Sequence, residues 1–160
     1  MSQETPLKLA ALDAEDLLVV SAHVQDAVLR VGDLLWTPAG HRFALAMNRF
    51  AWENVEGRRR RAGYQRRRTA VHFDRVIAVR SIGIDRAQAD RVLSLLAIEF
   101  TMGAAPAGEV KLVFAGGAEI HLTVECIEAQ LSDLGGAWKT GARPAHDLDN
   151  ETDPAANAPD

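Results

Sequence analysis

The sequence predicts an α+β domain built mainly on an antiparallel sheet or small barrel of about seven strands, with one early helix and a C-terminal capping helix. Ile120, Leu122 and Val124 alternate with polar residues, which is the two-residue period of a strand with one buried face. Just before them, Gly116-Gly117 can adopt the positive φ angles of a tight hairpin turn. Other short apolar runs, separated by glycine and proline, are typical of further antiparallel strands.

The early helix is predicted from Asp13 to about Asp26. Asp13 suits the N-cap position because its carboxylate can accept a hydrogen bond from a free backbone N–H of the first turn. Leu17, Val20 and Val24 recur at helical spacing and form one apolar stripe. We therefore expect one face of this helix to pack on the core.

A hairpin is predicted next. Val28–Trp36 is rich in branched and aromatic residues, which favour a strand. Pro38 and Gly40 then mark a turn before a second strand that starts at Phe43.

In that second strand the apolar residues change face. Phe43, Leu45 and Met47 share one parity, whereas Phe50 and Trp52 have the other. Either a bulge or a strand that is apolar on both faces explains the change, and the pattern does not choose between them.

Three later segments complete the predicted fold. Thr69–Val79 has apolar residues of one parity and is interpreted as one strand. Val92–Phe100 fits a helical stripe or a buried strand, and the turn-rich Gly103–Gly108 that follows favours the strand. Cys126–Leu134 has apolar residues at helical spacing and precedes Gly135, a favourable C-cap residue, so we predict a closing helix.

This order of segments fits a pleckstrin-homology-like barrel, and an open antiparallel sheet with both helices on one face is the alternative. The length predicts a single globular domain over residues 1–145. Residues 146–160 are acidic and have Leu148 as their one large apolar side chain. They bury too little apolar surface to offset the entropy of ordering, so we expect a disordered acidic tail.

Composition narrows the class of protein. With 48% hydrophobic and 25% charged residues, the chain is unlike wholly disordered, collagen-like or disulfide-rich proteins. Its single cysteine, Cys126, cannot form an internal disulfide. No apolar run is long enough to span a membrane, and the first residues lack the features of a signal peptide. We therefore expect a cytoplasmic protein.

An arginine-rich segment is the most unusual feature. Seven arginines fall in two short runs, and since the net charge is −4, the rest of the chain sums to −4 − 7, or −11. We interpret the segment as an exposed loop that binds an anionic partner, which could be an acidic protein segment, a nucleotide or nucleic acid. A solvated loop that balances the acidic body is the alternative. The candidate anion-binding residues are Arg58, Arg59, Arg60, Arg61, Tyr64, Arg66, Arg67 and Arg68.

The histidines do not form a metal-binding pattern, and no cofactor or catalytic motif is found, so we predict no metal, no cofactor and no catalytic residue. His72 and His121 both lie opposite the main apolar parity of their strands and could meet on one sheet face. A small enzyme with a pocket near this pair is the alternative function. The absence of catalytic motifs favours a non-enzymatic binding or adaptor module.

Four segments together are similar to a known family: Leu93–Phe100, Leu112–Ile120, Val124–Leu134 and Arg143–His146. They resemble an alphaproteobacterial family of unknown function, domain of unknown function 2948. The resemblance spans roughly Leu7 to His146. It implies no activity, cofactor or catalytic residue.

Overall fold

A computed structural model describes residues 6–51 and 65–139, and side chains are described up to residue 135. The early helix is α1 (Ala14–His23). The strands are β1 (Lys8–Ala11), β2 (Val28–Arg30), β3 (Leu34–Thr37), β4 (Arg42–Phe50), β5 (Gln65–Phe73), β6 (Val76–Ile82), β7 (Val92–Met102), β8 (Gly108–Phe114), β9 (Glu119–Val124) and β10 (Ala129–Lys139). Within these ranges no helix has the length and apolar character needed to cross a membrane.

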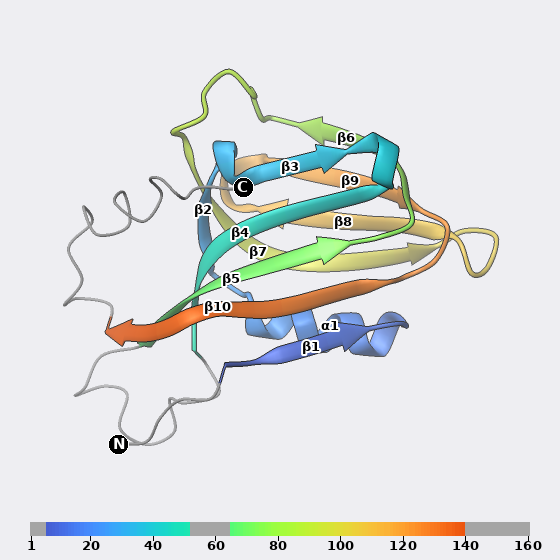
Figure 1. Ribbon diagram of the computed structural model, residues 1–160. Coiled ribbons are helices and arrows are strands. Elements are labelled where there is room, and N and C mark those ends of the chain that lie inside the picture. The colour runs from blue at the N-terminus through green and yellow to red at the C-terminus, as the bar shows by residue number, and fades with distance from the viewer. Residues whose placement is uncertain (1–5, 52–64, 140–160) are drawn as a thin grey trace.

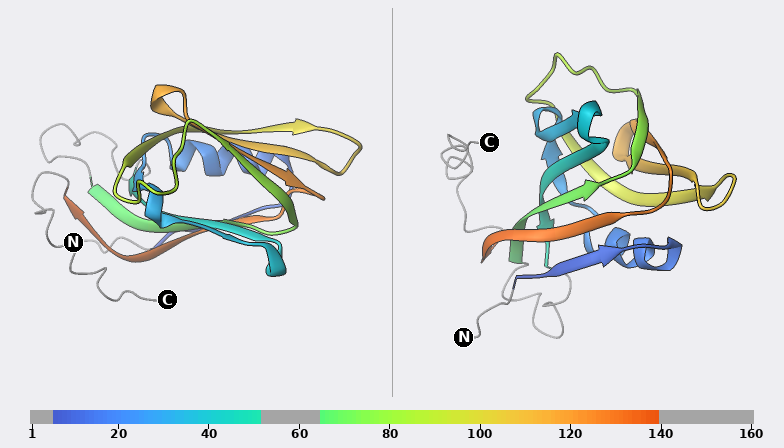
Figure 2. Two further views of the ribbon diagram at one scale, coloured as in Figure 1. Left: turned by 90° about the horizontal axis from the view of Figure 1, so that it is seen from above. Right: turned by 45° about the vertical axis from the view of Figure 1, so that its right-hand side comes forward.

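The strands form one 10-stranded antiparallel sheet in the order β1-β10-β5-β4-β2-β7-β8-β9-β6, with β3 paired to β4 beside this path (Figure 1). The short β2 pairs with both β4 and β7. The sheet folds over there, so that β4, β5 and β10 form one layer and β7, β8 and β9 form the other (Figure 2). The two end strands, β1 and β6, do not pair with each other, so the sheet of the described residues is open and not a closed barrel.

The core lies between the two layers. Phe43, Leu45 and Val71 from one layer and Leu112 and Leu122 from the other are at most 3% exposed. The strand alternation that the sequence shows in β4 and β9 is therefore the alternation between core and solvent. Burial of these apolar side chains supplies most of the free energy that holds the layers together.

The predicted helix is confirmed, and α1 packs against β1 and β7 and so connects the two layers. Asp13 Oδ1 accepts a hydrogen bond from the backbone N–H of Asp16 at 2.8 Å, which caps the first turn. Leu17 and Val20 are buried, as is Val24 just after the helix.

The strand interpretation of Val92–Phe100 is confirmed, because β7 spans Val92–Met102 and pairs with β8. The predicted glycine turn is confirmed as well. Gly116 and Gly117 have φ angles of 85° and 89° between β8 and β9. A side chain at either position would be strained, since L-residues rarely adopt such angles.

The prediction of a closing helix over Cys126–Leu134 is wrong. The described residues end in β10, which pairs with β5 on one side and with β1 on the other. Ile127 and Leu131 are four residues apart, a spacing compatible with a helix face and also with one face of a strand. Ladders on both sides pair the backbone of β10 over Ala129–Ser132. Leu134, the third residue of the predicted helical stripe, is 57% exposed. With no closing helix here and an open sheet, the pleckstrin-homology-like barrel is not formed.

The structure corrects one further interpretation and decides between two open alternatives. Thr69–Val79 is two strands, since β5 ends at Phe73 and a turn with Arg75 at φ 64° precedes β6. In β4 there is no bulge, because its register with β5 is continuous from Phe43 to Phe50. The tail 146–160 and Trp52 lie outside the described residues.

Candidate anion-binding site

Arg66–Arg68 lie in β5 and not in a loop, so that part of the sequence prediction is wrong. Arg66 pairs in register with Phe50 of β4, and β10 pairs along the other edge of β5. Strand pairing on both edges holds these arginines in an extended backbone despite their mutual repulsion. Arg58–Arg61 and Tyr64 lie outside the described residues.

Alternation along β5 separates the three arginines. Arg67 points to the inner face and is 1% exposed, whereas Arg66 and Arg68 are half-buried on the outer face. Neighbouring arginines therefore lie in two different environments, one buried on the inner face and one half-buried on the outer face.

On the outer face, the Arg66 guanidinium lies over the Phe50 ring, with its central carbon 4.1 Å from the ring centroid. Its Nη1 donates to the backbone oxygen of Asn48 at 3.4 Å. Within residues 6–51 and 65–139 no carboxylate pairs with it. Burial lowers the pKa of Arg66 from its ordinary value, since the charged form is partly removed from water.

Arg68, the next outward residue, is more fully paired. Its Nη1 donates to Asn48 Oδ1 at 3.3 Å, and its Nη2 lies 3.6 Å from Asp33 Oδ1. On the outer face, Arg66, which has no acidic partner among the described residues, thus lies beside Arg68, whose charge is partly neutralised.

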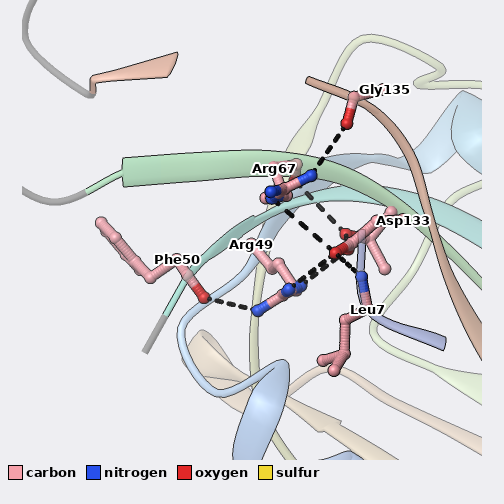
Figure 3. Close-up of polar contacts among 7 residues, drawn as sticks. Leu7, Arg49, Phe50, Arg67, Asp133 and Gly135 are labelled. Carbon is pink, nitrogen blue, oxygen red and sulfur yellow. Dashed lines mark hydrogen bonds and ion pairs between the residues drawn. The ribbon is translucent and has the colours of Figure 1, made fainter. Parts of the chain in front are cut away.

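The inner face ends in a buried ionic cluster (Figure 3). Arg49 of β4 pairs with Asp133 of β10 through two hydrogen bonds, Nε to Oδ1 at 3.0 Å and Nη2 to Oδ2 at 2.9 Å. Both side chains are 0% exposed. Thr69 Oγ1 and the Leu7 backbone N–H also donate to Asp133, each at 2.7 Å.

The pKa of Asp133 reflects these contacts. Burial alone would raise it, but the hydrogen bonds from Arg49, the Leu7 amide and Thr69 outweigh burial and hold the pKa below its ordinary value. Asp133 is therefore ionised at neutral pH. It joins β4, β5 and β10 to Leu7, the residue before β1, at the end of the core.

Sequence reasoning missed Arg49 and Asp133. Arg49 has the same parity as Phe43, Leu45 and Met47, so the alternation already placed it on the core face. The apparent change of face at Phe50 arises because an arginine occupies that inward position. Asp133 was missed because its segment was predicted to be a helix.

A family model described as "Protein of unknown function (DUF2948)" matches residues 7–146, which include all of the described sheet. The chain belongs to this family. Comparison with curated proteins and with solved structures finds no match. The matched region of this DUF2948 member contains both the outer arginines and the buried cluster, so their roles must be argued from geometry.

The structure does not bring His72 and His121 together. They lie on β5 and β9, with β4, β2, β7 and β8 between them in the sheet. His72 Nδ1 lies 3.4 Å from Asp74 Oδ2, while burial and the charge of Arg42 lower the pKa of His72. His121 contacts Glu109 at 3.1 Å and Glu119 at 2.8 Å.

Neither histidine lines the pocket between β3–β4 and β6. That pocket has a volume of about 30 Å³, room for about two water molecules, and its walls are largely apolar. Trp36, Phe43 and Val79 are among the residues that line this pocket.

Across the described ranges no group of three or more histidine, cysteine, aspartate or glutamate side chains is arranged to hold a metal ion.

Proposed function

We propose that this DUF2948 protein is a non-enzymatic binding module that receives an acidic protein segment on the outer face of β4 and β5, at Arg66 and Arg68. The observation that carries the proposal is the environment of Arg66. Its guanidinium is held over Phe50, is half-buried, and has no carboxylate partner among the described residues. A charged group in that position gains most from an anionic ligand, since its own desolvation is not compensated.

The surroundings favour a short acidic segment over a nucleic acid. Asp33 and Asp74 lie near the ends of the β4–β5 ladder, and the chain outside the arginine runs carries −11. A nucleic acid presents consecutive phosphates and needs a longer basic surface, which these acids would interrupt. An acidic segment that offers one or two carboxylates needs only Arg66 and Arg68 as its partners. Arg58–Arg61 and Tyr64, which precede Arg66 in the sequence, would extend recognition along the segment.

The test uses a fluorescent oligoglutamate peptide and fluorescence anisotropy. We expect Arg66→Gln to weaken binding by about 10- to 150-fold, the range for losing one charge-assisted hydrogen bond. Arg80→Gln is the matched control, because Arg80 is an exposed arginine on β6 that already pairs with Glu109 at 3.6 Å. Binding should also weaken with added salt.

Three results would contradict the proposal. Equal losses from Arg66→Gln and Arg80→Gln would show that only net charge matters. Tighter binding of a single-stranded oligonucleotide than of the peptide, with the same dependence on Arg66, would identify nucleic acid as the partner. No salt-sensitive binding of either probe would mean that the outer arginines are only solvated.

A further inference from the structure

Arg67 and Arg49 have matching hydrogen-bond arrangements, with one difference. Arg49 uses its Nη1 on the backbone oxygen of Phe50 and its Nε–Nη2 edge on the Asp133 carboxylate. Arg67 likewise uses its Nη1 on a backbone oxygen, that of Gly135, at 3.1 Å. Its Nε and Nη2 are buried and have no hydrogen-bond acceptor among the described residues. These two donors form the planar edge that binds carboxylate or phosphate in a bidentate manner. The dashed line from Arg67 to Asp133 in Figure 3 marks an ion pair.

Asp133 cannot serve as that acceptor. A carboxylate offers about four lone-pair positions. Those of Asp133 are taken by the two bonds from Arg49, one from Thr69 and one from the Leu7 amide. Arg67 Nε accordingly lies 3.8 Å from Asp133 Oδ2, which is an electrostatic contact without a hydrogen bond. Two buried guanidinium donors without an acceptor in the described part of the chain are unfavourable, and a further acceptor would stabilise them.

The backbone beside Arg67 is interrupted in a way that suits a ligand. Asp133 pairs with Thr69 and Ala137 with Arg67, so β10 has two more residues than β5 between these pairs and forms a bulge. The Gly135 oxygen turns from the bulge to Arg67. Gly135 is exposed, and a Cβ built there would meet no atom within 4 Å. Bulges of this kind commonly lie beside binding sites, where they end strand pairing.

We infer that the Nε–Nη2 edge of Arg67, beside the β10 bulge, binds a small oxyanion with two oxygens in carboxylate-like geometry. This site lies on the inner face and does not rest on the proposed function of Arg66 and Arg68. The ligand is a small carboxylate or inorganic phosphate, which share the required pair of oxygens. It reaches Arg67 through the exposed bulge around Gly135.

The test measures melting temperature in chloride buffer and on titration with acetate or phosphate at constant ionic strength. At about one hundred times the dissociation constant, binding to the folded state should raise the wild-type melting temperature by roughly 5 to 10 °C, and the temperature should go on rising with the logarithm of the anion concentration. Arg67→Lys keeps the charge but lacks the planar edge and should lose this effect. Arg66→Gln should retain it, which separates this site from the proposed function. The anion that produces a given rise at the lower concentration identifies the source.

Two more measurements keep the inference open to refutation. In chloride alone, Arg67→Met should melt at or above the wild-type temperature, because it removes two unsatisfied buried donors. In NMR spectra, the Arg67 Nε–H signal, identified by its loss in Arg67→Lys, should shift as the anion is added. An equal rise in all variants, Arg67→Lys included, would be the general salting-out effect and would overturn the inference. So would a strongly destabilised Arg67→Met with no anion response in the wild type, since Arg67 would then be a structural partner of Asp133.

Discussion

Replacing Asp133 with asparagine tests the buried cluster most directly. The substitution keeps the size of the side chain and leaves no cavity, so its effect is electrostatic. It removes the carboxylate that receives two hydrogen bonds from Arg49 and one each from Thr69 and the Leu7 amide. It also places an NH₂ group against donors. The guanidiniums of Arg49 and Arg67 then remain buried without a charged acceptor in the cluster.

The expected cost follows from burial. Breaking a buried ion pair by removing one partner costs about 3 to 5 kcal/mol, because the remaining charge is uncompensated. Glu99→Gln is the matched control, since Glu99 pairs with Lys111 at 3.7 Å and their side chains are 56% and 35% exposed. Solvent screens this pair, so its loss should cost at most about 1 kcal/mol.

Urea denaturation measures both variants. With an m-value of about 2 kcal/mol/M, Asp133→Asn should lower the midpoint by roughly 1.5 to 2.5 M, against at most about 0.5 M for Glu99→Gln. The reasoning is refuted if the two midpoints fall by similar amounts at neutral pH.

The pH dependence provides a second check. The pKa of Asp133 is lowered in the folded state, so the unfolded state binds its proton first as pH falls. Its stabilisation is therefore complete above the ordinary aspartate pKa of about 4 and is lost as pH falls through the lower folded-state value. The stability difference between wild type and Asp133→Asn should shrink over that acidic range and stay constant near neutral pH. A difference that is independent of pH would argue against an ionic role.

Two further substitutions test the sheet. Leu122→Ala should cost about 2 to 5 kcal/mol because Leu122 is 0% exposed, whereas Thr123→Ala on the solvent face should change stability by at most about 0.5 kcal/mol in the same titrations. Gly108→Ala should cost about 1 to 3 kcal/mol or more, since its Cβ would approach the Thr101 carbonyl oxygen more closely than real Cβ atoms do. Gly103→Ala, where the nearest atom is 3.6 Å away, should be nearly neutral in thermal melts, and equal effects at the two glycines would contradict the packing described.

Local signals predicted much of the fold. The cap at Asp13 and the stripe of Leu17 and Val20 act within one helical turn, so the helix could be located from neighbouring residues alone. The β8–β9 hairpin was equally local, since Gly116-Gly117 and the flanking alternation specify both turn and register. These elements depend little on the rest of the chain.

The incorrect predictions concern segments whose structure depends on pairing with strands that are distant in the sequence. A spacing of four residues between Ile127 and Leu131 fits a helix or a strand, and pairing with β1 and β5 selected the strand. The prediction of an exposed loop at Arg66–Arg68 was wrong for the same reason. A run of charges suggested an exposed loop, but the ladder with β4 placed Arg66 over Phe50.

The sequence by itself determined the capped helix, the alternating strands, the glycine turn and the concentration of positive charge in one segment, because each depends on residues close together in the chain. Only the tertiary structure decided that the sheet stays open and that β10 is a strand. It also decided that Arg67 is buried beside Asp133, which is 66 residues away in the chain. Pairing over such separations is set by which strands fold together, and a polar residue on a core face reveals its partner only when those strands meet.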